Sequence, residues 1–417
     1  MIKNLFSFYF LLNSLLSISQ IFLKPKKIDF NFTSTEYSLG KTAPPNTFFP
    51  DVKLQNGIVF SLGKTNYNNN LEWAYRLNFP KTGLSISYVD YGNLDKVGTA
   101  LTIMPFIDFK VFANFSSKMN LKIGLGGSCF NRIYDKITNP YNKGISLNYT
   151  WAFRANLYYK ILDTNNFNLK LGVGYFHNSN GHLRLPNNGL NTFFGSVSAD
   201  FNYKKFEIKD TIISHFKSRQ TYFNTRLGLG FKVLTKNDNK KEAVYTYSTS
   251  MGFIINKTFK YGCGFYYRFY NDYYNYIKND GILVTENYPE LKENSVLSAS
   301  NIGVFVNGEI LLSHFGVEME LGLNLYKPAY KIDWLLNEEK YVNGAFEPKG
   351  LNDYYKLKKI VSTRLGIKWY AINSNKSPLN NFYIGTFINA NLGQADFSEI
   401  TFGYIKCFKL KINKPKV

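Results

Sequence analysis

The sequence has few of the residues that metal and disulfide centres use. It contains three cysteines and four histidines in 417 residues, and the cysteines (Cys129, Cys263 and Cys407) lie far apart. An odd number of widely spaced cysteines predicts neither a disulfide framework nor a zinc site. We therefore expect no metal ion and no cofactor in this protein.

The sequence also lacks a long apolar run. After the N-terminus, no segment approaches the roughly 20 apolar residues that a membrane-spanning helix needs. Aromatic residues are abundant instead, with 37 phenylalanines and 32 tyrosines. Transmembrane β-barrels use aromatic side chains as girdles and on the lipid-facing surface. The composition therefore favours one barrel over several soluble domains.

Acidic residues are scarce relative to basic ones, and the formal net charge is +21. Nucleic acid is one partner that such a charge suggests, but the lysines are spread over loops and alternate strand positions. An exported basic barrel would instead meet anionic lipid headgroups or a phosphorylated glycolipid. We expect no nucleic-acid partner.

The N-terminus has the pattern of a secretory signal peptide over residues 1–19. Lys3 is followed by an apolar segment, and Ser17-Ile18-Ser19 forms a small-residue cleavage site before Gln20. An uncleaved membrane anchor is the alternative. Residues 20–54 are interpreted as a lead-in segment with no clear structure.

From residue 55 to residue 417 the chain repeats one pattern. Segments of about ten residues alternate apolar with small or polar side chains, and Asn, Asp, Gly and Lys fill the turns between them. An apolar face opposite a face of glycine and charge suits lipid outside and a polar lumen. The predicted fold is all-β: one antiparallel outer-membrane barrel of roughly 12–16 strands.

The hairpin at residues 175–192 carries the candidate chemistry. His177 and Ser179 continue the apolar face of the strand that precedes them, and Asn191 continues the apolar face of the next strand. Because side chains two residues apart share a face of a strand, the three polar groups should converge on the outer, lipid side of the barrel. The long loops place this hairpin on the external side of the membrane.

These residue types are those of a serine esterase. A serine hydroxyl needs a base, and imidazole is the usual one, so His177 would activate Ser179. Asn191 can accept from the imidazole and orient it, and Gly181 can bring a backbone N–H to a developing oxyanion. The competing interpretation is that His177 and Ser179 are polar residues at the rim of the barrel and have no catalytic role.

The same residues resemble a known family. His177-Asn178-Ser179-Asn180, followed by Pro186-Asn187-Asn188-Gly189, is similar to the signature of the outer-membrane lipid A 3-O-deacylases, or acyloxyacyl hydrolases, over residues 169–201. The resemblance implies hydrolysis of an ester-linked acyl chain of lipid A or a similar outer-leaflet glycolipid. It assigns the base to His177, the nucleophile to Ser179 and the third position to Asn191, with Asn180 and Asn187 supporting the oxyanion or substrate.

One position departs from the family pattern, which has a glutamate where this chain has Asn191. An amide orients an imidazole but does not stabilise imidazolium as an anion does. Slower turnover, lost catalysis, or a carboxylate from an external loop, with Asp135 as one candidate, are the open alternatives. His182 and Arg184 are possible headgroup contacts or plain solvated loop residues.

Two functions remain in competition from the sequence alone. The first is an outer-membrane serine esterase with a Ser-His-Asn triad, exported by a cleaved signal peptide. The second is a non-catalytic porin or binding barrel that keeps a degenerate deacylase hairpin, since 14 or more strands would leave a water-filled lumen. The sequence carries no signal for the oligomeric state.

Overall fold

The computed structural model of the chain describes residues 30–112, 118–164, 166–202, 217–237, 239–342, 345–409 and 411–413. The expected signal peptide at residues 1–19 lies outside them. Among the described residues, no helix is long and apolar enough to cross a membrane.

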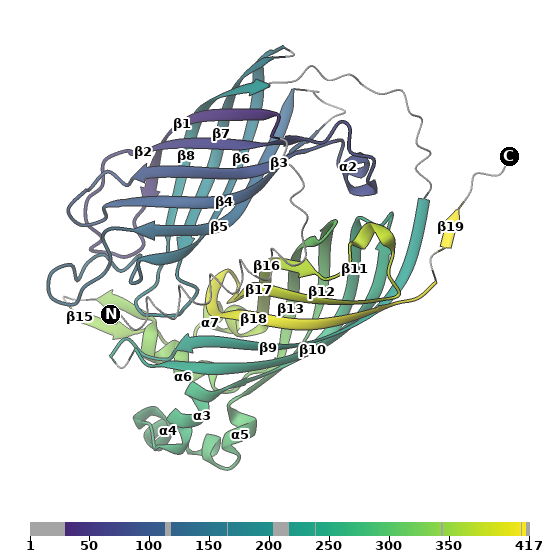
Figure 1. Cartoon of the computed structure of the whole chain (residues 1–417). Coiled ribbons are helices and arrows are strands. Elements are labelled where there is room, and N and C mark those ends of the chain that lie inside the picture. Colours follow the sequence, from purple (N-terminus) through teal and green to yellow (C-terminus); the bar gives the residue numbers. More distant parts are fainter. Residues whose placement is uncertain are drawn as a thin grey trace, which may run out of the picture.

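The strands form two closed antiparallel rings of eight, which lie side by side in Figure 1. The all-β class and the antiparallel barrel are therefore confirmed. The expectation of one ring of 12–16 strands is wrong, because the sixteen strands close in two separate sets.

Barrel 1 contains the candidate hairpin, and each of its strands pairs with its neighbours in sequence. The first and last strands close the ring in a continuous register from Phe32 opposite Asn202 to Ala43 opposite Asn191. Its strands are β1 (Phe32–Ala43), β2 (Gln55–Thr65), β3 (Lys81–Asp90), β4 (Thr99–Lys110), β5 (Met119–Phe130), β6 (Tyr149–Asp163), β7 (Phe167–Ser179) and β8 (Leu190–Asn202).

Barrel 2 follows, and its closing pair is β9 with β18. Its strands are β9 (Lys217–Val233), β10 (Lys241–Ile255), β11 (Phe259–Tyr270), β12 (Ser300–Leu312), β13 (Phe315–Tyr326), β16 (Val361–Tyr370), β17 (Asn380–Asn391) and β18 (Gln394–Cys407). Outside the ring, β14 (Glu339–Val342) pairs with β15 (Ala345–Pro348), and β19 (Lys411–Asn413) extends the edge of β9.

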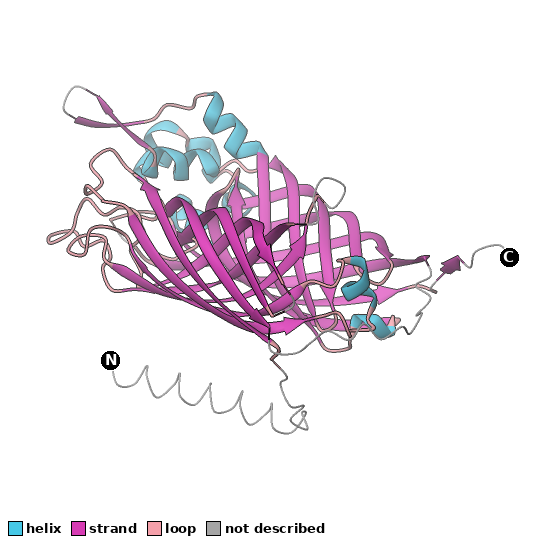
Figure 2. Ribbon diagram, turned by 90° about the horizontal axis from the view of Figure 1, so that it is seen from above, coloured by secondary structure: helices cyan, strands magenta, loops and turns pink. Residues whose placement is uncertain are grey.

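The helices are short and lie beyond the strand ends, in the loops that connect the strands (Figure 2). They are α2 (Glu72–Arg76), α3 (Asn271–Lys278), α4 (Ile282–Asn287), η1 (Pro289–Lys292), α5 (Ser295–Ser298), α6 (Tyr330–Asn337), α7 (Asp353–Ile360) and η2 (Ser374–Lys376). Helices α3, α4, η1 and α6 contribute to an apolar cluster at one end of barrel 2, around Tyr270, Tyr273 and Phe397.

β1 lies within the segment expected to be a lead-in of uncertain structure. Its inward face carries Ser34, Glu36 and Ser38, all buried, and its outward face mixes Thr35 with Tyr37. The alternation is regular, but few of its residues are apolar, so the hydrophobic pattern is weak. Residues 32–43 are nevertheless a full strand of the ring.

Paired charges fill the interior of barrel 1. Glu36 on β1 receives a hydrogen bond from Arg154 Nη2 at 2.6 Å and another from Tyr158 at 2.5 Å. Lys170 and Asp200 lie 3.0 Å apart on neighbouring strands. These groups are almost fully buried, and buried charges persist where each has a partner.

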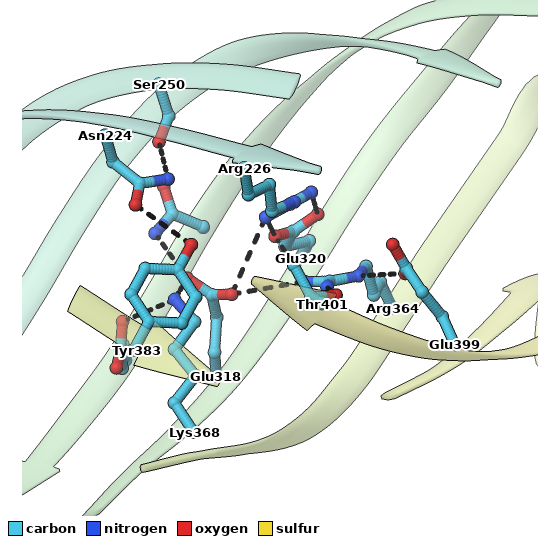
Figure 3. A network of polar contacts seen from close by, with 12 residues as sticks. Asn224, Arg226, Ser250, Glu318, Glu320, Arg364, Lys368, Tyr383, Glu399 and Thr401 are labelled. Atoms are coloured by element: carbon cyan, nitrogen blue, oxygen red, sulfur yellow. Dashed lines mark hydrogen bonds and ion pairs between the residues drawn. The ribbon is translucent and has the colours of Figure 1, made fainter. Parts of the chain in front are cut away.

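The interior of barrel 2 is filled in the same way. In Figure 3, Arg226 and Glu320 point toward each other across the lumen, with Nη2 and Oε2 2.8 Å apart. Arg364 Nε donates to Glu399 Oε2 at 3.0 Å. A ring of eight strands is just wide enough for side chains to fill. The wide water-filled lumen that motivated the porin alternative is therefore replaced by two narrow, occupied lumens.

Direct contacts join the two barrels at both ends. At one end, the amide of Val233 donates to the carbonyl of His182, and Trp151 Nε1 donates to Ser398 Oγ at 3.2 Å. At the other end, Trp73 Nε1 donates to Ser313 Oγ at 3.1 Å. The long loops of both barrels therefore lie at the same end, which contains the hairpin at 180–189.

Candidate active site

The alternation of β7 and β8 places His177 and Asn191 on the outer face of barrel 1. Val173 has the parity of His177 on β7, and Phe193 has the parity of Asn191 on β8; each is 65% exposed. Phe176 and Thr192, which have the opposite parity on the same two strands, are buried. His177 and Asn191 are direct partners in the antiparallel register. Their side chains meet, with Nδ1 of His177 2.7 Å from Oδ1 of Asn191.

This contact fixes the tautomer of the imidazole. The Asn191 Oδ1 atom has no proton to give, so the proton of the pair must lie on His177 Nδ1. The Nε2 atom then carries a lone pair and is the basic nitrogen. This is the state that a general base requires.

Tyr175 is a member of the site that the sequence analysis did not identify. Its hydroxyl donates to the same Asn191 Oδ1 at 2.5 Å, and its ring is stacked with the imidazole at 6.4 Å between centroids. Tyr175 lies two residues before His177, so strand parity alone could have placed it there.

Two donors converge on Ser179. The Asn187 amide donates to Ser179 Oγ at 2.8 Å, and the backbone N–H of Gly181 donates to it at 3.2 Å. Ser179 is only 5% exposed. Because these donors occupy the lone pairs of the oxygen, the hydroxyl proton of Ser179 remains available for donation to another group. N–H donors that lie beside a serine hydroxyl are of the kind that can stabilise an oxyanion.

Asn180 holds one of these donors in place through hydrogen bonds to residues other than Ser179. Its backbone N–H donates to Asn187 Oδ1 at 3.0 Å, which turns the Asn187 amide nitrogen toward Ser179. Its side-chain amide donates to Ser146 Oγ at 2.9 Å and to the carbonyl of Arg184 at 2.8 Å. Asn180 is therefore a positioning residue of the hairpin.

Ser179 and His177 line the same cavity. Among the described residues, the hydrogen bonds of Ser179 Oγ are those with Asn187 and Gly181, and none joins it to His177. Catalytic hydrogen bonds are often longer without substrate and tighten in the bound complex. Ser179 and His177 therefore face one cavity, and Asn191 contacts the Nδ1 nitrogen of the imidazole.

Gly189 lies close to the imidazole of His177 and leaves room for the ring because it has no side chain. Its φ is +73°, and a Cβ there would lie 2.9 Å from His177 Cε1. We expect Gly189→Ala to displace the ring and to lower the turnover of an ester substrate by about a hundredfold, the cost of misplacing a catalytic group by about 1 Å. Turnover should be measured beside thermal unfolding of the barrel.

Gly98→Ala is the matched control for this change. Gly98, at the end of the loop between β3 and β4, has a φ of +76° and does not line the cavity, and a Cβ there would meet the side chain of Asn131. It imposes similar backbone strain without touching the imidazole. An equal loss of turnover in both variants would contradict the steric role of Gly189.

The other sequence candidates lie away from this cluster. Asp135 is exposed and accepts from the amides of Thr138 and Ile137, which keep its pKa below the usual range. His182 is buried where the hairpin meets β9, and burial, with the charge of Lys232, lowers its pKa. Arg184 is exposed. None of the three lines the cavity that contains Ser179.

The cavity has a volume of about 1190 Å³ and lies between the two barrels. Barrel 1 contributes Tyr175, His177, Ser179, Asn187 and Asn191 to its wall. The opposite wall consists of residues of barrel 2, none of which the sequence analysis connected to the site.

The comparisons with known proteins bear on this part of the chain. Residues 58–200 match the family model of Lipid A 3-O-deacylase (PagL). The matched segment runs from β2 to β8 and includes every residue of the cluster described above. The resemblance inferred from the hairpin is thereby confirmed, and at the level of the family it supports an ester hydrolase of the outer membrane that acts on lipid A.

The solved structures that resemble the chain have low sequence identity to it. The crystal structure of the outer membrane enzyme PagL is 16% identical and covers 40% of this chain and 97% of its own, with a TM-score of 0.26. OprB of Pseudomonas putida is 13% identical over 91% of this chain and 94% of its own, with a TM-score of 0.18. Comparison with curated proteins gives no match.

Proposed function

We propose that this protein is an outer-membrane serine esterase that removes an ester-linked acyl chain from lipid A or a similar glycolipid. The observation that carries the proposal is the pairing of His177 with Asn191 on the outer face of β7 and β8, beside the buried Ser179. This cluster lies in the segment that matches the deacylase family.

The geometry suggests how each group would act. Ser179 Oγ attacks the ester carbonyl while its proton passes to Nε2 of His177. The N–H groups of Gly181 and Asn187 stabilise the oxyanion of the tetrahedral intermediate. The intermediate collapses, the glycolipid alcohol leaves with the proton from His177, and water then releases the acyl group from Ser179 by the reverse sequence.

The location of the cluster suits a lipid substrate. Its side chains share the outer strand face with Leu171 and Val173, both exposed, and in a membrane this face meets acyl chains. A substrate in the external leaflet would reach Ser179 without entering either lumen. Residues 1–19 would act as the cleaved signal for export.

A non-catalytic binding barrel is the second candidate. The observation in its favour is Asn191 itself, since the imidazolium formed during the reaction would have no carboxylate partner within the cluster. Such a protein would bind the same glycolipid in the same cavity and leave its ester bonds intact.

Hydrolysis of lipid A separates the two candidates. Purified protein in detergent micelles should release one fatty acid per lipid A, and mass spectrometry should show the loss of a single ester-linked chain. A serine-directed fluorophosphonate should label Ser179 in the same preparation. Intact lipid A and an unlabelled serine after prolonged incubation would exclude the esterase.

A further inference from the structure

Barrel 2 supplies an apolar wall to the cavity that contains Ser179. Met319 on β13, Leu365 on β16 and Ile388 on β17 line it opposite Leu125 and Phe153 of barrel 1. All five side chains come from outer strand faces, which would otherwise meet lipid. The space between them is therefore an apolar slot that opens toward Ser179.

Basic side chains line the loop end of the same cavity. They are Lys236, Lys349 and Lys358 of barrel 2 and Lys143 of barrel 1, and among the described residues Glu338 is the carboxylate that lines it with them. Arg364 also lines the cavity, but its guanidinium pairs with Glu399 and Glu320 inside barrel 2. Lys349 and Lys358 are therefore the two basic residues of this wall whose described partners decide what they can bind.

Lys358 on α7 is the most enclosed of these lysines. It is 5% exposed, its Nζ donates to Gln394 Oε1, and it lies 4.6 Å from the centre of the Tyr354 ring. Among the described residues, no carboxylate lies within ion-pair distance of Lys358. Lys349, in contrast, pairs with Glu338 at 3.0 Å. An enclosed ammonium group with neutral partners can accept an anion.

We propose that barrel 2 forms the second half of the substrate site. Its outer strands would pack against the acyl chain, and Lys349 and Lys358 would bind a phosphate group of the glycolipid headgroup. The proposal rests on the proposed function. A volume of about 1190 Å³ exceeds the range of about 300–1000 Å³ usual for small ligands, and it suits a headgroup with the first part of its chains.

Binding of two lipids to one catalytically silent protein tests the inference. Ser179→Ala protein, in an uncharged detergent, is titrated with bisphosphorylated lipid A and with the same lipid after removal of its phosphates, and tryptophan fluorescence is followed because Trp151 lines the cavity. We expect the phosphorylated lipid to bind at least about tenfold more tightly. Adding Lys349→Met and Lys358→Met should remove most of this preference.

Lys356→Met, on the same helix, is the matched control. Lys356 is exposed, pairs with Asp353 and does not line the cavity, so it should leave the preference unchanged. Equal affinity for the two lipids, or an equal loss in the control, would overturn the inference. If the protein prefers the phosphorylated lipid but the wild type does not hydrolyse it, the esterase is rejected and the phosphate site is supported. If the wild type hydrolyses lipid A but the protein shows no phosphate preference, the esterase is supported and the phosphate site is rejected.

Discussion

Ser179→Ala is expected to lower the release of fatty acid from lipid A by at least about a thousandfold, because the change removes the attacking oxygen while leaving its donors in place. The barrel should remain folded, since the substitution removes one oxygen from a rim position. Initial rates of fatty-acid release, compared at equal amounts of folded protein, measure the effect.

Ser295→Ala serves as the control for this change. Ser295 begins α5 of barrel 2, far from the hairpin in sequence and outside the residues that line the cavity. Its rate should equal that of the wild-type protein. A Ser179→Ala protein that still releases fatty acid at the wild-type rate would remove the basis for the proposed esterase.

Asn191→Leu is expected to lower kcat by about a thousandfold or more, because His177 would lose the acceptor that fixes its tautomer and Tyr175 would lose the same partner. KM should change less, since Asn191 acts through the imidazole. The measurement is a full kinetic comparison on micellar lipid A. An unchanged kcat would mean that Asn191 is not the third member of the site.

Asn191→Asp tests the same position in the opposite direction. The substitution keeps the Oδ1 acceptor and adds the negative charge that the family pattern has at this point, so kcat at neutral pH should rise by about tenfold, or about 1.4 kcal/mol. A fall in kcat would show that the chain has adapted its hairpin to a neutral amide.

Much of barrel 1 could be predicted from the sequence because strand alternation is a local signal. The outer faces of β7 and β8 followed from the parity of residues such as Val173 and Phe193, and the same parity put His177 and Asn191 on one surface. Tyr175 was within reach of that reasoning. The hydrogen bonds from Asn187 and Gly181 to Ser179 depend on the path of the turn, which alternation does not determine.

Ring closure could not be predicted in the same way. Nothing in the alternation of β8 shows that it pairs with β1 rather than with β9, because both strands present similar polar inner faces. The pairing depends on complementary groups far apart in sequence, such as Arg154 with Glu36 and Arg226 with Glu320. The second wall of the cavity could not be predicted for the same reason, since Lys358 and Ser179 line one cavity only when two rings form.

The even strand count of each ring has a consequence for how the chain crosses the membrane. β1 begins and β8 ends at the edge away from the candidate site, and β9 begins at that edge too, because its last residue, Val233, meets the site hairpin. Each ring therefore starts and finishes in the same compartment. A complete ring therefore leaves the chain on the side of the membrane where it began. A second ring can follow the first, and both then expose their loop ends on the same side.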